Sequence, residues 1–151
     1  MVKRQDVQIR HSTEEDGEAQ VSIWRSSVAD THSFVSRRDL AAIDLEVQQF
    51  LPEMPAWLAL DQSGRPIAFM ILSEGTIEAV FVAGDQQGCG AGRALVEHAM
   101  RGAKSLATVV NEQNERAVGF YRRLGFITVG RSLNDEQGRP YPILHMRWDG
   151  Q

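Results

Sequence analysis

The chain has 151 residues, of which 42% are hydrophobic and 24% are charged, with 16 Lys and Arg against 20 Asp and Glu. This composition is typical of a globular protein and argues against disorder, collagen-like structure and coiled coil. The formal net charge of −4 argues against a nucleic-acid backbone as the main partner. No window approaches the roughly 18 uninterrupted apolar residues that a transmembrane helix needs, so we expect no membrane partner.

The length fits one domain over residues 1–151, because a chain of this size can bury roughly 70% of its unfolded surface in one core. No repeat, low-complexity tract or linker marks a boundary. The first residues run into polar side chains instead of a signal-peptide apolar region, which predicts a cytoplasmic protein. The oligomeric state stays open between a monomer and a homodimer. The single cysteine and the absence of an i,i+4 histidine pair predict no disulfide framework and no metal site.

The first third of the chain predicts one strand and two helices. Residues 7–11 alternate like a short strand, and residues 12–16 are typical of a helix N-cap followed by an acidic first turn. The first helix would run to about residue 30 and bury Val21, Trp24 and Val28. A second helix is expected over about 38–50, with its apolar face formed by Leu40, Ile43, Val47 and Phe50 and its end set by Pro52 and Pro55.

The remaining elements alternate between strand and helix patterns. Apolar runs predict an antiparallel meander over 56–60, 67–72 and 77–82, with a hairpin signal at 61–66. Two helices, over 91–103 and 114–124, are separated by a strand at 106–110, and two final strands are expected over about 126–133 and 141–148. This order predicts an α+β fold whose sheet has both antiparallel and parallel pairs.

The most informative segment is residues 80–93, where a strand passes through a glycine-rich loop into the N-terminus of a helix. Glycines let a ligand approach the backbone, and the free N–H groups of a first helical turn suit a phosphate or pyrophosphate. A dinucleotide fingerprint starting at Gly88 would need Gly or Ala where Arg93 stands, and the chain contains no G-x-x-x-x-G-K-[ST]. Neither NAD nor ATP is therefore the expected ligand.

Two motifs carry a resemblance to a known family. The loop matches Q/R-x-x-G-x-G/A at Gln87-Gly88-Cys89-Gly90-Ala91-Gly92, and residues 114–126 match N-x-x-A-x-x-F-Y-x-x-x-G-F at every fixed position. With the preceding strand they resemble the GNAT superfamily of acyl-CoA-dependent N-acetyltransferases. The bacterial YjaB-type branch of that superfamily is also similar at residues 23–24, 31–34, 50–52 and 138–142. One departure is Gly84, where many members have proline, and we expect it to loosen the loop.

The resemblance implies the acyl-CoA N-acyltransferase fold, a mixed and mainly antiparallel central sheet flanked by helices. It also implies acetyl-CoA as co-substrate, with no metal. The cofactor-binding residues would come from the strand, the loop and the second helix: Val80, Phe81, Val82, Gln87, Gly88, Cys89, Gly90, Ala91, Gly92, Arg93, Asn114, Ala117 and Phe120. The strand would bind the pantetheine arm and place a backbone N–H at the oxyanion. For Asn114, helix capping alone remains open.

The catalytic assignments also follow from the resemblance. Tyr121 would be the general acid, because a phenol with a reference pKa near 10 is protonated at neutral pH and can protonate a thiolate whose acid has a pKa near 8.5. The alternative is a tyrosine that only forms a wall of the pocket. Cys89 would lie at the pyrophosphate end, far from the thioester, which argues against covalent catalysis.

The general base is less well defined. Glu78 resembles the position of a glutamate base in several members. If Val80 and Val82 face the core, Glu78 shares their face, and burial would raise the pKa of its carboxyl. A solvated strand glutamate is the alternative, and His32 is the second candidate for the base. Beside His32, the residues expected at the acceptor site are Phe34, Tyr141 and His145, with core packing as the alternative.

The sequence therefore predicts an N-acetyltransferase that moves an acetyl group from acetyl-CoA directly to an amine in a ternary complex. The acceptor would be a small-molecule amine or a protein lysine. Two alternatives remain open: a non-catalytic acyl-CoA-binding module on the same fold, and an aminoacyl-tRNA-acetylating toxin, which the acidic composition disfavours.

Overall fold

The computed structural model describes residues 6–31 and 34–150. Within these residues one sheet contains seven strands in the order β1-β2-β3-β4-β5-β7-β6. The strands are Gln8–His11 (β1), Trp57–Leu60 (β2), Pro66–Ser73 (β3), Thr76–Val82 (β4), Ser105–Asn111 (β5), Ile127–Ser132 (β6) and Ile143–Asp149 (β7). Neighbouring strands are antiparallel except for β4 and β5, which are parallel. This sheet confirms the predicted fold class.

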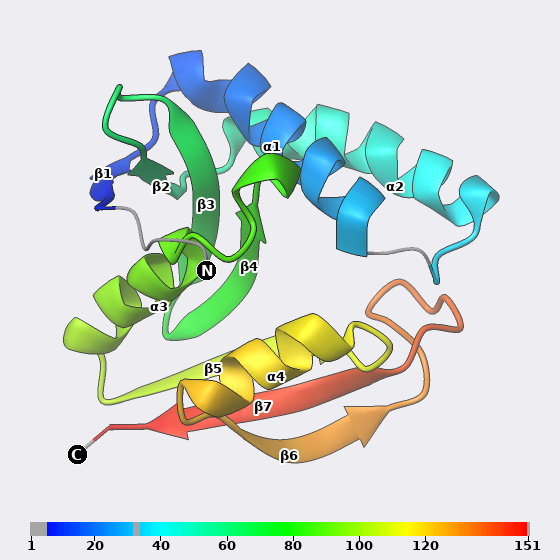
Figure 1. Ribbon diagram of the computed structural model, residues 1–151. Coiled ribbons are helices and arrows are strands. Elements are labelled where there is room, and N and C mark those ends of the chain that lie inside the picture. The colour runs from blue at the N-terminus through cyan, green and yellow to red at the C-terminus, as the bar shows by residue number, and fades with distance from the viewer. Residues whose placement is uncertain (1–5, 32–33, 151) are drawn as a thin grey trace.

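The helices cover the sheet in two groups (Figure 1). They are Gly17–Thr31 (α1), Arg37–Phe50 (α2), Ala91–Arg101 (α3) and Glu115–Arg123 (α4), with short 3₁₀ turns at Glu14–Asp16 (η1), Leu51–Glu53 (η2) and Gly84–Gln86 (η3). One core cluster lies under α1 and α2, and the other lies under α3 and α4. The order of strands and α-helices is the one that the sequence predicts.

The predicted helix faces are largely correct. Val21, Trp24 and Val28 of α1 are buried, as expected. Phe50 differs, because its side chain is 61% exposed. The chain turns there into η2, and the neighbouring Leu51 is buried instead. In the described part of the chain, no helix has both the length and the apolarity needed to cross a membrane.

The parallel pair β4 and β5 is paired over only a short stretch. Thr76 pairs with Ala107 and Ile77 with Thr108, and no later register pair joins the two strands within the described residues. The strands then separate, which divides the sheet into a β1–β4 part and a β5–β7 part (Figure 1). This separation opens the sheet at its centre.

A β-bulge lies in β4 at the point where the strands separate. Ile71 of β3 pairs with Ala79 and Leu72 pairs with Ile77, so Glu78 has no partner in that register. The extra residue shifts the alternation of side chains: Val80 and Val82 pack against the α3/α4 core, whereas Ala79 and Phe81 pack against the α1/α2 core. The expected burial of Glu78 beside Val80 and Val82 is wrong, because the bulge leaves its side chain exposed.

Candidate active site

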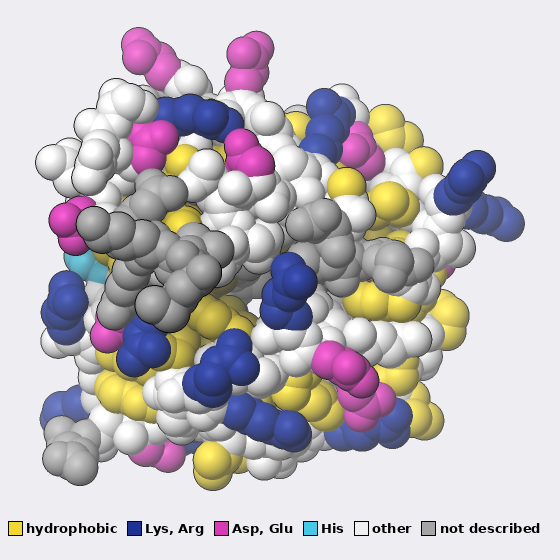
Figure 2. All heavy atoms as spheres, in the orientation of Figure 1, with side chains coloured by type: hydrophobic (Ala, Val, Ile, Leu, Met, Phe, Trp, Pro, Cys, Tyr) yellow, Lys and Arg dark blue, Asp and Glu magenta, His cyan; other side chains and the backbone are white. Residues whose placement is uncertain are grey.

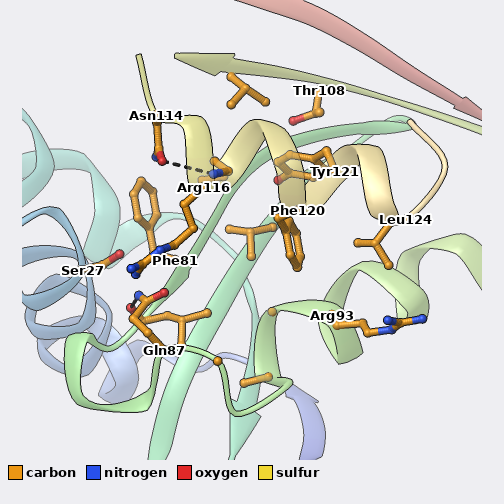
Figure 3. A pocket seen from close by; sticks show the side chains of 18 of the residues that line it. Ser27, Phe81, Gln87, Arg93, Thr108, Asn114, Arg116, Phe120, Tyr121 and Leu124 are labelled. Carbon is orange, nitrogen blue, oxygen red and sulfur yellow. Dashed lines mark hydrogen bonds between the residues drawn. The ribbon is translucent and has the colours of Figure 1, made fainter. Parts of the chain in front are cut away.

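A cleft of about 720 Å³ occupies the space between β4 and β5. Its walls come from β4, the loop that follows it, the start of α3, β5 and α4 (Figure 3). Every residue predicted to bind the cofactor lines this cleft, as do the two predicted catalytic residues, Tyr121 and Glu78. Segments that are far apart in sequence, from Ser27 of α1 to Leu124 after α4, thus meet in one cavity, whose size is within the range of small-molecule sites.

The glycine loop ends in backbone groups that suit an anion. Gly88 and Gly90 have φ values of +79° and +93°, which L side chains rarely adopt, and Gly90 is the N-cap of α3. The N–H of Ala94 donates to the Gly90 carbonyl at 3.0 Å. The preceding N–H groups, of residues 91–93, have no acceptor within the helix, and the positive end of the helix dipole lies there.

Two hydrogen bonds hold the loop in place. The Gln87 side chain donates from Nε2 to the Val82 carbonyl at 2.7 Å, and the Gly84 N–H donates to Ser26 Oγ at 2.7 Å. A Cβ atom on Gly84 would lie 2.8 Å from the Ser26 carbonyl oxygen. The expectation that Gly84 loosens the loop is therefore wrong: glycine permits a close contact with α1, and its N–H forms a bond that proline cannot make.

The first turn of α3 packs closely against the cleft walls. A Cβ atom on Gly92 would lie 3.2 Å from Val82 Cγ2 and 3.6 Å from Phe120 Cζ. Arg93 lies one residue further along, and its Nε pairs with Glu97 Oε1 at 3.2 Å. Its side chain points along α3 and away from the loop (Figure 3), so its backbone N–H is the group best placed to meet a ligand.

One edge of β4 faces the cleft without a neighbouring strand, and of its backbone groups the Val82 carbonyl accepts from Gln87 Nε2. The Ala83 N–H donates to the Ile67 carbonyl at 2.9 Å, on the side of β3. Because backbone groups alternate between the two edges of a strand, those of Val80 and Val82 face the opposite edge, where β5 has moved away. An extended ligand can bind there as an added strand would.

Tyr121 of α4 is buried and lines the cleft with a ring that carries a hydroxyl. Its side chain packs edge-on against Phe126, with ring centroids 5.2 Å apart. Burial raises the pKa of Tyr121 to about 12, and a hydrogen bond with the Thr108 side chain opposes that rise. The phenol is therefore protonated at neutral pH.

The N-terminus of α4 brings polar and basic groups to the same cleft. Asn114 caps the helix, with Oδ1 accepting from the Ala117 N–H at 3.2 Å, so the predicted capping role is present. Its side chain also lines the cleft, where its amide group is a potential donor to a ligand. Arg116 extends toward Gln87 across the cleft (Figure 3). Basic side chains gather on the face of the molecule seen in Figure 2, and Arg116 and Arg123 of α4 line the cleft.

Sequence reasoning missed several residues of the cleft. The polar ones are Ser27, Gln86, Thr108, Asn111, Arg116 and Arg123. The spacing of Arg116, Phe120 and Arg123 places the two arginines on the helix face that carries Phe120, and this signal was present in the sequence. No local pattern identifies Ser27 or Thr108, because each reaches the cleft only through the packing of its element.

Three of the predicted acceptor residues, Phe34, Tyr141 and His145, lie outside the lining of this cleft. Phe34 and Tyr141 meet edge-on with ring centroids 6.2 Å apart, and the Tyr141 hydroxyl donates to Asp39 and accepts from the Ser36 N–H. These contacts join the loop between β6 and β7 to the start of α2 (Figure 1). His32 lies outside the described residues.

His145 of β7 occupies a different position. Its Nε2 is 2.9 Å from Ser132 Oγ of β6, and it pairs in register with Val109 of β5. Directly opposed residues of an antiparallel pair share one face of the sheet, and Val109 lines the cleft. His145 is therefore one strand away from the cleft, whereas Phe34 and Tyr141 form a separate group.

The geometry suits an elongated ligand with an anionic end and a reactive end. The glycine loop and Arg116 offer binding groups for phosphate, the β4 edge offers backbone hydrogen bonds, and Tyr121 offers a proton at the buried end. No group of three potential metal ligands occurs among residues 6–31 and 34–150.

Comparison with known proteins identifies the family. The sequence profile of the Acetyltransferase (GNAT) family matches residues 21–126, which is more than half of the chain. The chain belongs to the GNAT family. A curated GNAT relative, the peptidyl-lysine N-acetyltransferase YjaB of Escherichia coli (strain K12), is 46% identical over 144 residues, which cover 95% of this chain and 98% of YjaB. The family membership predicted from the two motifs is thereby confirmed, and the protein is a GNAT acetyltransferase.

Solved structures agree with the GNAT assignment. The solution structure of apo YjaB from Escherichia coli matches with a TM-score of 0.91 at 46% identity, covering 97% of this chain and 99% of that one. The PaiA N-acetyltransferase of Thermoplasma acidophilum, solved in complex with coenzyme A, matches with a TM-score of 0.74 at 17% identity, covering 95% and 99% of the two chains. At that identity the second likeness concerns the fold alone.

Proposed function

We propose that this GNAT protein transfers an acetyl group from acetyl-CoA directly to the side-chain amine of a lysine in a peptide or protein. The observation that carries the proposal is the cleft between β4 and β5, which has an anion-binding loop near one end and a buried phenol at the other. The YjaB proteins of Escherichia coli and Salmonella typhimurium, 46% and 45% identical to this chain, are named peptidyl-lysine N-acetyltransferases, which supports the choice of acceptor.

Acetyl-CoA is assigned as the donor because its parts match the parts of the cleft. Its pyrophosphate would bind the N–H groups of Ala91, Gly92 and Arg93, with the guanidinium of Arg116 nearby. Its amide-containing arm would form hydrogen bonds with the exposed edge of β4. A backbone N–H of Val80 or Val82 would then stabilise the oxyanion that develops at the thioester carbonyl.

Tyr121 is assigned as the general acid. A phenol with a pKa of about 12 lies about three to four units above a thiol with a reference pKa of about 8.5, so proton transfer would be unfavourable in water. The departing thiolate would form in the same buried region, where loss of hydration raises the pKa of a thiol as well. The rise in the pKa of the thiol therefore offsets part of the rise in the pKa of Tyr121, and the gap between the two in the cleft is smaller than these three to four units.

The acceptor amine must lose a proton before or during its attack. A lysine with a pKa of about 10.4 is less than about 0.1% neutral at pH 7, so a base should assist. We propose Glu78 for this role, directly or through water, because its exposed carboxylate lies on the cleft wall at the β4 bulge. His32 remains the second candidate, and the role of His145 and of the Phe34 and Tyr141 pair at the acceptor site stays a prediction.

A single assay tests the choice of acceptor. Release of free CoA thiol from acetyl-CoA is measured with lysine-containing peptides, polyamines, amino acids and amine antibiotics, and peptides with arginine in place of lysine are the matched control. We expect release with the lysine peptides alone. Release with small amines only would contradict the lysine assignment, and acetyl-CoA binding without any turnover would favour a non-catalytic module. The monomer or homodimer and the cytoplasmic location stay predictions.

A further inference from the structure

Thr108 is a polar residue in a core position. Its side chain is 3% exposed, and Leu106 and Val110, which share its face of β5, belong to the apolar core under α3 and α4. A buried hydroxyl destabilises a protein unless it forms hydrogen bonds, and valine would fill the same volume without that cost. The position of Thr108 in the core therefore does not by itself require a hydroxyl.

The first contact of this hydroxyl is with the backbone of β4. Thr108 Oγ1 donates to the Ile77 carbonyl at 2.9 Å. Ile77 and Thr108 form the last register pair before β4 and β5 separate, and Glu78 of the bulge follows immediately. Thr108 thus lies at the vertex from which the cleft opens.

The second contact is with Tyr121. The two side chains lie next to each other in the cleft lining, one from β5 and one from α4 (Figure 3). Hydrogen bonding by the Thr108 side chain lowers the pKa of Tyr121, against the larger rise that burial causes. A threonine hydroxyl has one proton and two lone pairs. While Thr108 donates to the Ile77 carbonyl, it can only accept from the protonated Tyr121 hydroxyl. If Tyr121 loses its proton, the Thr108 hydroxyl can rotate and donate to the phenolate instead.

We propose that Thr108 is a positioning residue for the acetyl transfer, which directs the Tyr121 hydroxyl and then donates a hydrogen bond to the Tyr121 phenolate. The inference rests on the proposed role of Tyr121 as general acid. As the tetrahedral intermediate collapses, the C–S bond breaks and its electron pair goes to sulfur. The Tyr121 proton passes to sulfur, which gives the CoA thiol and a phenolate. The proton removed from the amine leaves to solvent, and Tyr121 regains one from solvent.

A catalytic positioning role and a purely structural role of the Thr108 hydroxyl have different consequences for kinetics. A hydroxyl that only joined β4 to β5 would affect folding and cofactor binding, with or without Tyr121. A hydroxyl that stabilises the phenolate affects the transition state and depends on the presence of the phenol. Removal of the Thr108 hydroxyl should therefore lower kcat without changing the KM for acetyl-CoA, and only when the Tyr121 hydroxyl is present.

The test compares Thr108→Val and Thr108→Ser, each with the Tyr121 hydroxyl present and in a Tyr121→Phe background. We expect Thr108→Val to lower kcat by about 10- to 100-fold, the effect of losing one hydrogen bond to a charged group, with the KM for acetyl-CoA within about threefold of wild type. Thr108→Ser should retain most of the activity. Thr76→Val, the same change at the neighbouring register pair and outside the cleft lining, is the matched control.

The double variant, Thr108→Val with Tyr121→Phe, shows whether the effect of Thr108 depends on the Tyr121 hydroxyl. Thr108→Val should cause no further loss in the Tyr121→Phe background, because both changes remove the same interaction. An equal loss in both backgrounds, or wild-type kcat in Thr108→Val, would overturn the role of Thr108. Wild-type kcat in Tyr121→Phe alone would instead remove the proposed role of Tyr121. If circular dichroism shows that Thr108→Val does not fold, Thr108→Ala is judged by the same criteria.

Discussion

Tyr121 has a ring packed in the core and a hydroxyl at the wall of the cleft, so the two parts can be separated by mutation. Its ring contacts Phe120 and Phe126 edge-on, and these contacts survive in phenylalanine. Thr108 and Glu78 lie on β5 and β4 on either side of the point where these strands part. At the scale of residues, proton transfer is therefore assigned to the narrow end of the cleft.

The Tyr121→Phe variant should lose about 10²- to 10⁴-fold in kcat, the span typical of a positioned general acid. Its affinity for acetyl-CoA should change little, because the hydroxyl acts only as the leaving group departs. Steady-state kinetics with the best acceptor and saturating acetyl-CoA measure the loss, and calorimetry measures the affinity. A variant that keeps more than about a third of wild-type kcat would reduce Tyr121 to a wall of the pocket.

Glu78→Gln should lower kcat/KM for the amine and remove the acidic limb of the pH–rate profile, because glutamine cannot accept the proton. His32→Gln, the same replacement at the second candidate, is the comparison. The measurement is initial rate against pH at saturating acetyl-CoA. If the profile changes only in His32→Gln, the assignment moves to His32, and if both profiles match wild type, neither residue is the base.

At the scale of elements, contacts at the start of α3 and just before α1 hold these helices against the sheet. The α3 N-terminus is held against β4 by the close approach of Gly92 to Val82. Near the N-terminus, Asp16 of η1 accepts from the Thr13 N–H at 2.7 Å and from Arg10 of β1 at 2.8 and 3.1 Å. These contacts fix edge strand β1 to η1, the turn that leads into α1.

Gly92→Asp should abolish acetyl-CoA binding, because the new side chain would crowd Val82 and Phe120 at the cleft wall and bring a carboxylate close to the N–H groups expected to bind the pyrophosphate. Gly102→Asp is the matched control: Gly102 ends the same helix, has φ of −102°, and nothing lies within 4 Å of a Cβ placed there. Calorimetry on folded protein gives the affinities. Binding within a few-fold of wild type in Gly92→Asp would place the phosphates elsewhere.

The Asp16 contacts predict a pH-dependent contribution to stability. Its hydrogen bonds with Arg10 lower the pKa of Asp16 from 3.8 to about 2 in the folded protein. The carboxylate therefore stabilises the fold at pH values above 3.8, and this stabilisation is lost as the pH falls toward 2. Asp16→Asn should lower the free energy of unfolding by about 1–2 kcal/mol at pH 7, because the Asp16 side chain is only 11% exposed.

Urea unfolding between pH 7 and pH 3 measures this difference. The wild type and Asp16→Asn should converge as the pH falls below about 4, which is the range where the unfolded carboxyl becomes protonated. Asp85→Asn is the control, because Asp85 is 63% exposed and meets Arg65 only at 3.9 Å. A difference between wild type and Asp16→Asn that stayed constant over the whole pH range would show that the charge of Asp16 does not contribute.

At the scale of the whole molecule, the separation of β4 and β5 turns a continuous sheet into a binding cleft. The two core clusters lie on opposite faces of the sheet, and α3 and α4 border the cleft. Ligand binding should therefore stabilise the fold, because the ligand would contact both parts of the sheet.

Acetyl-CoA at 100 times its dissociation constant should add about 2.7 kcal/mol to the free energy of unfolding. CoA should act in the same way, whereas NAD and ATP should have little effect, because the loop lacks their motifs. Thermal melts with each of the four compounds measure the shift. A rise with NAD or ATP and none with either CoA species would overturn the assignment of the donor.

Sequence predicted the features that depend on local chemistry. The glycines of the loop and the cap at Asn114 have local signatures, so the glycine loop before α3 and helix α4 lie where the sequence predicts them. The burial of Glu78 was predicted wrongly, because a β-bulge depends on pairing with β3 that the sequence of β4 does not show. Thr108 was missed for a similar reason: its importance arises from Ile77 and Tyr121, which are distant in sequence and meet it only in the fold.

The central claim is direct acetyl transfer from acetyl-CoA to a lysine amine within one complex. Initial rates of CoA release, measured while acetyl-CoA and a lysine peptide are varied together, test it most directly. We predict that release requires the peptide and that the double-reciprocal plots intersect, as expected when both substrates bind before the reaction. Release that is independent of the peptide, or parallel plots that indicate an acetylated enzyme such as one formed on Cys89, would contradict the account.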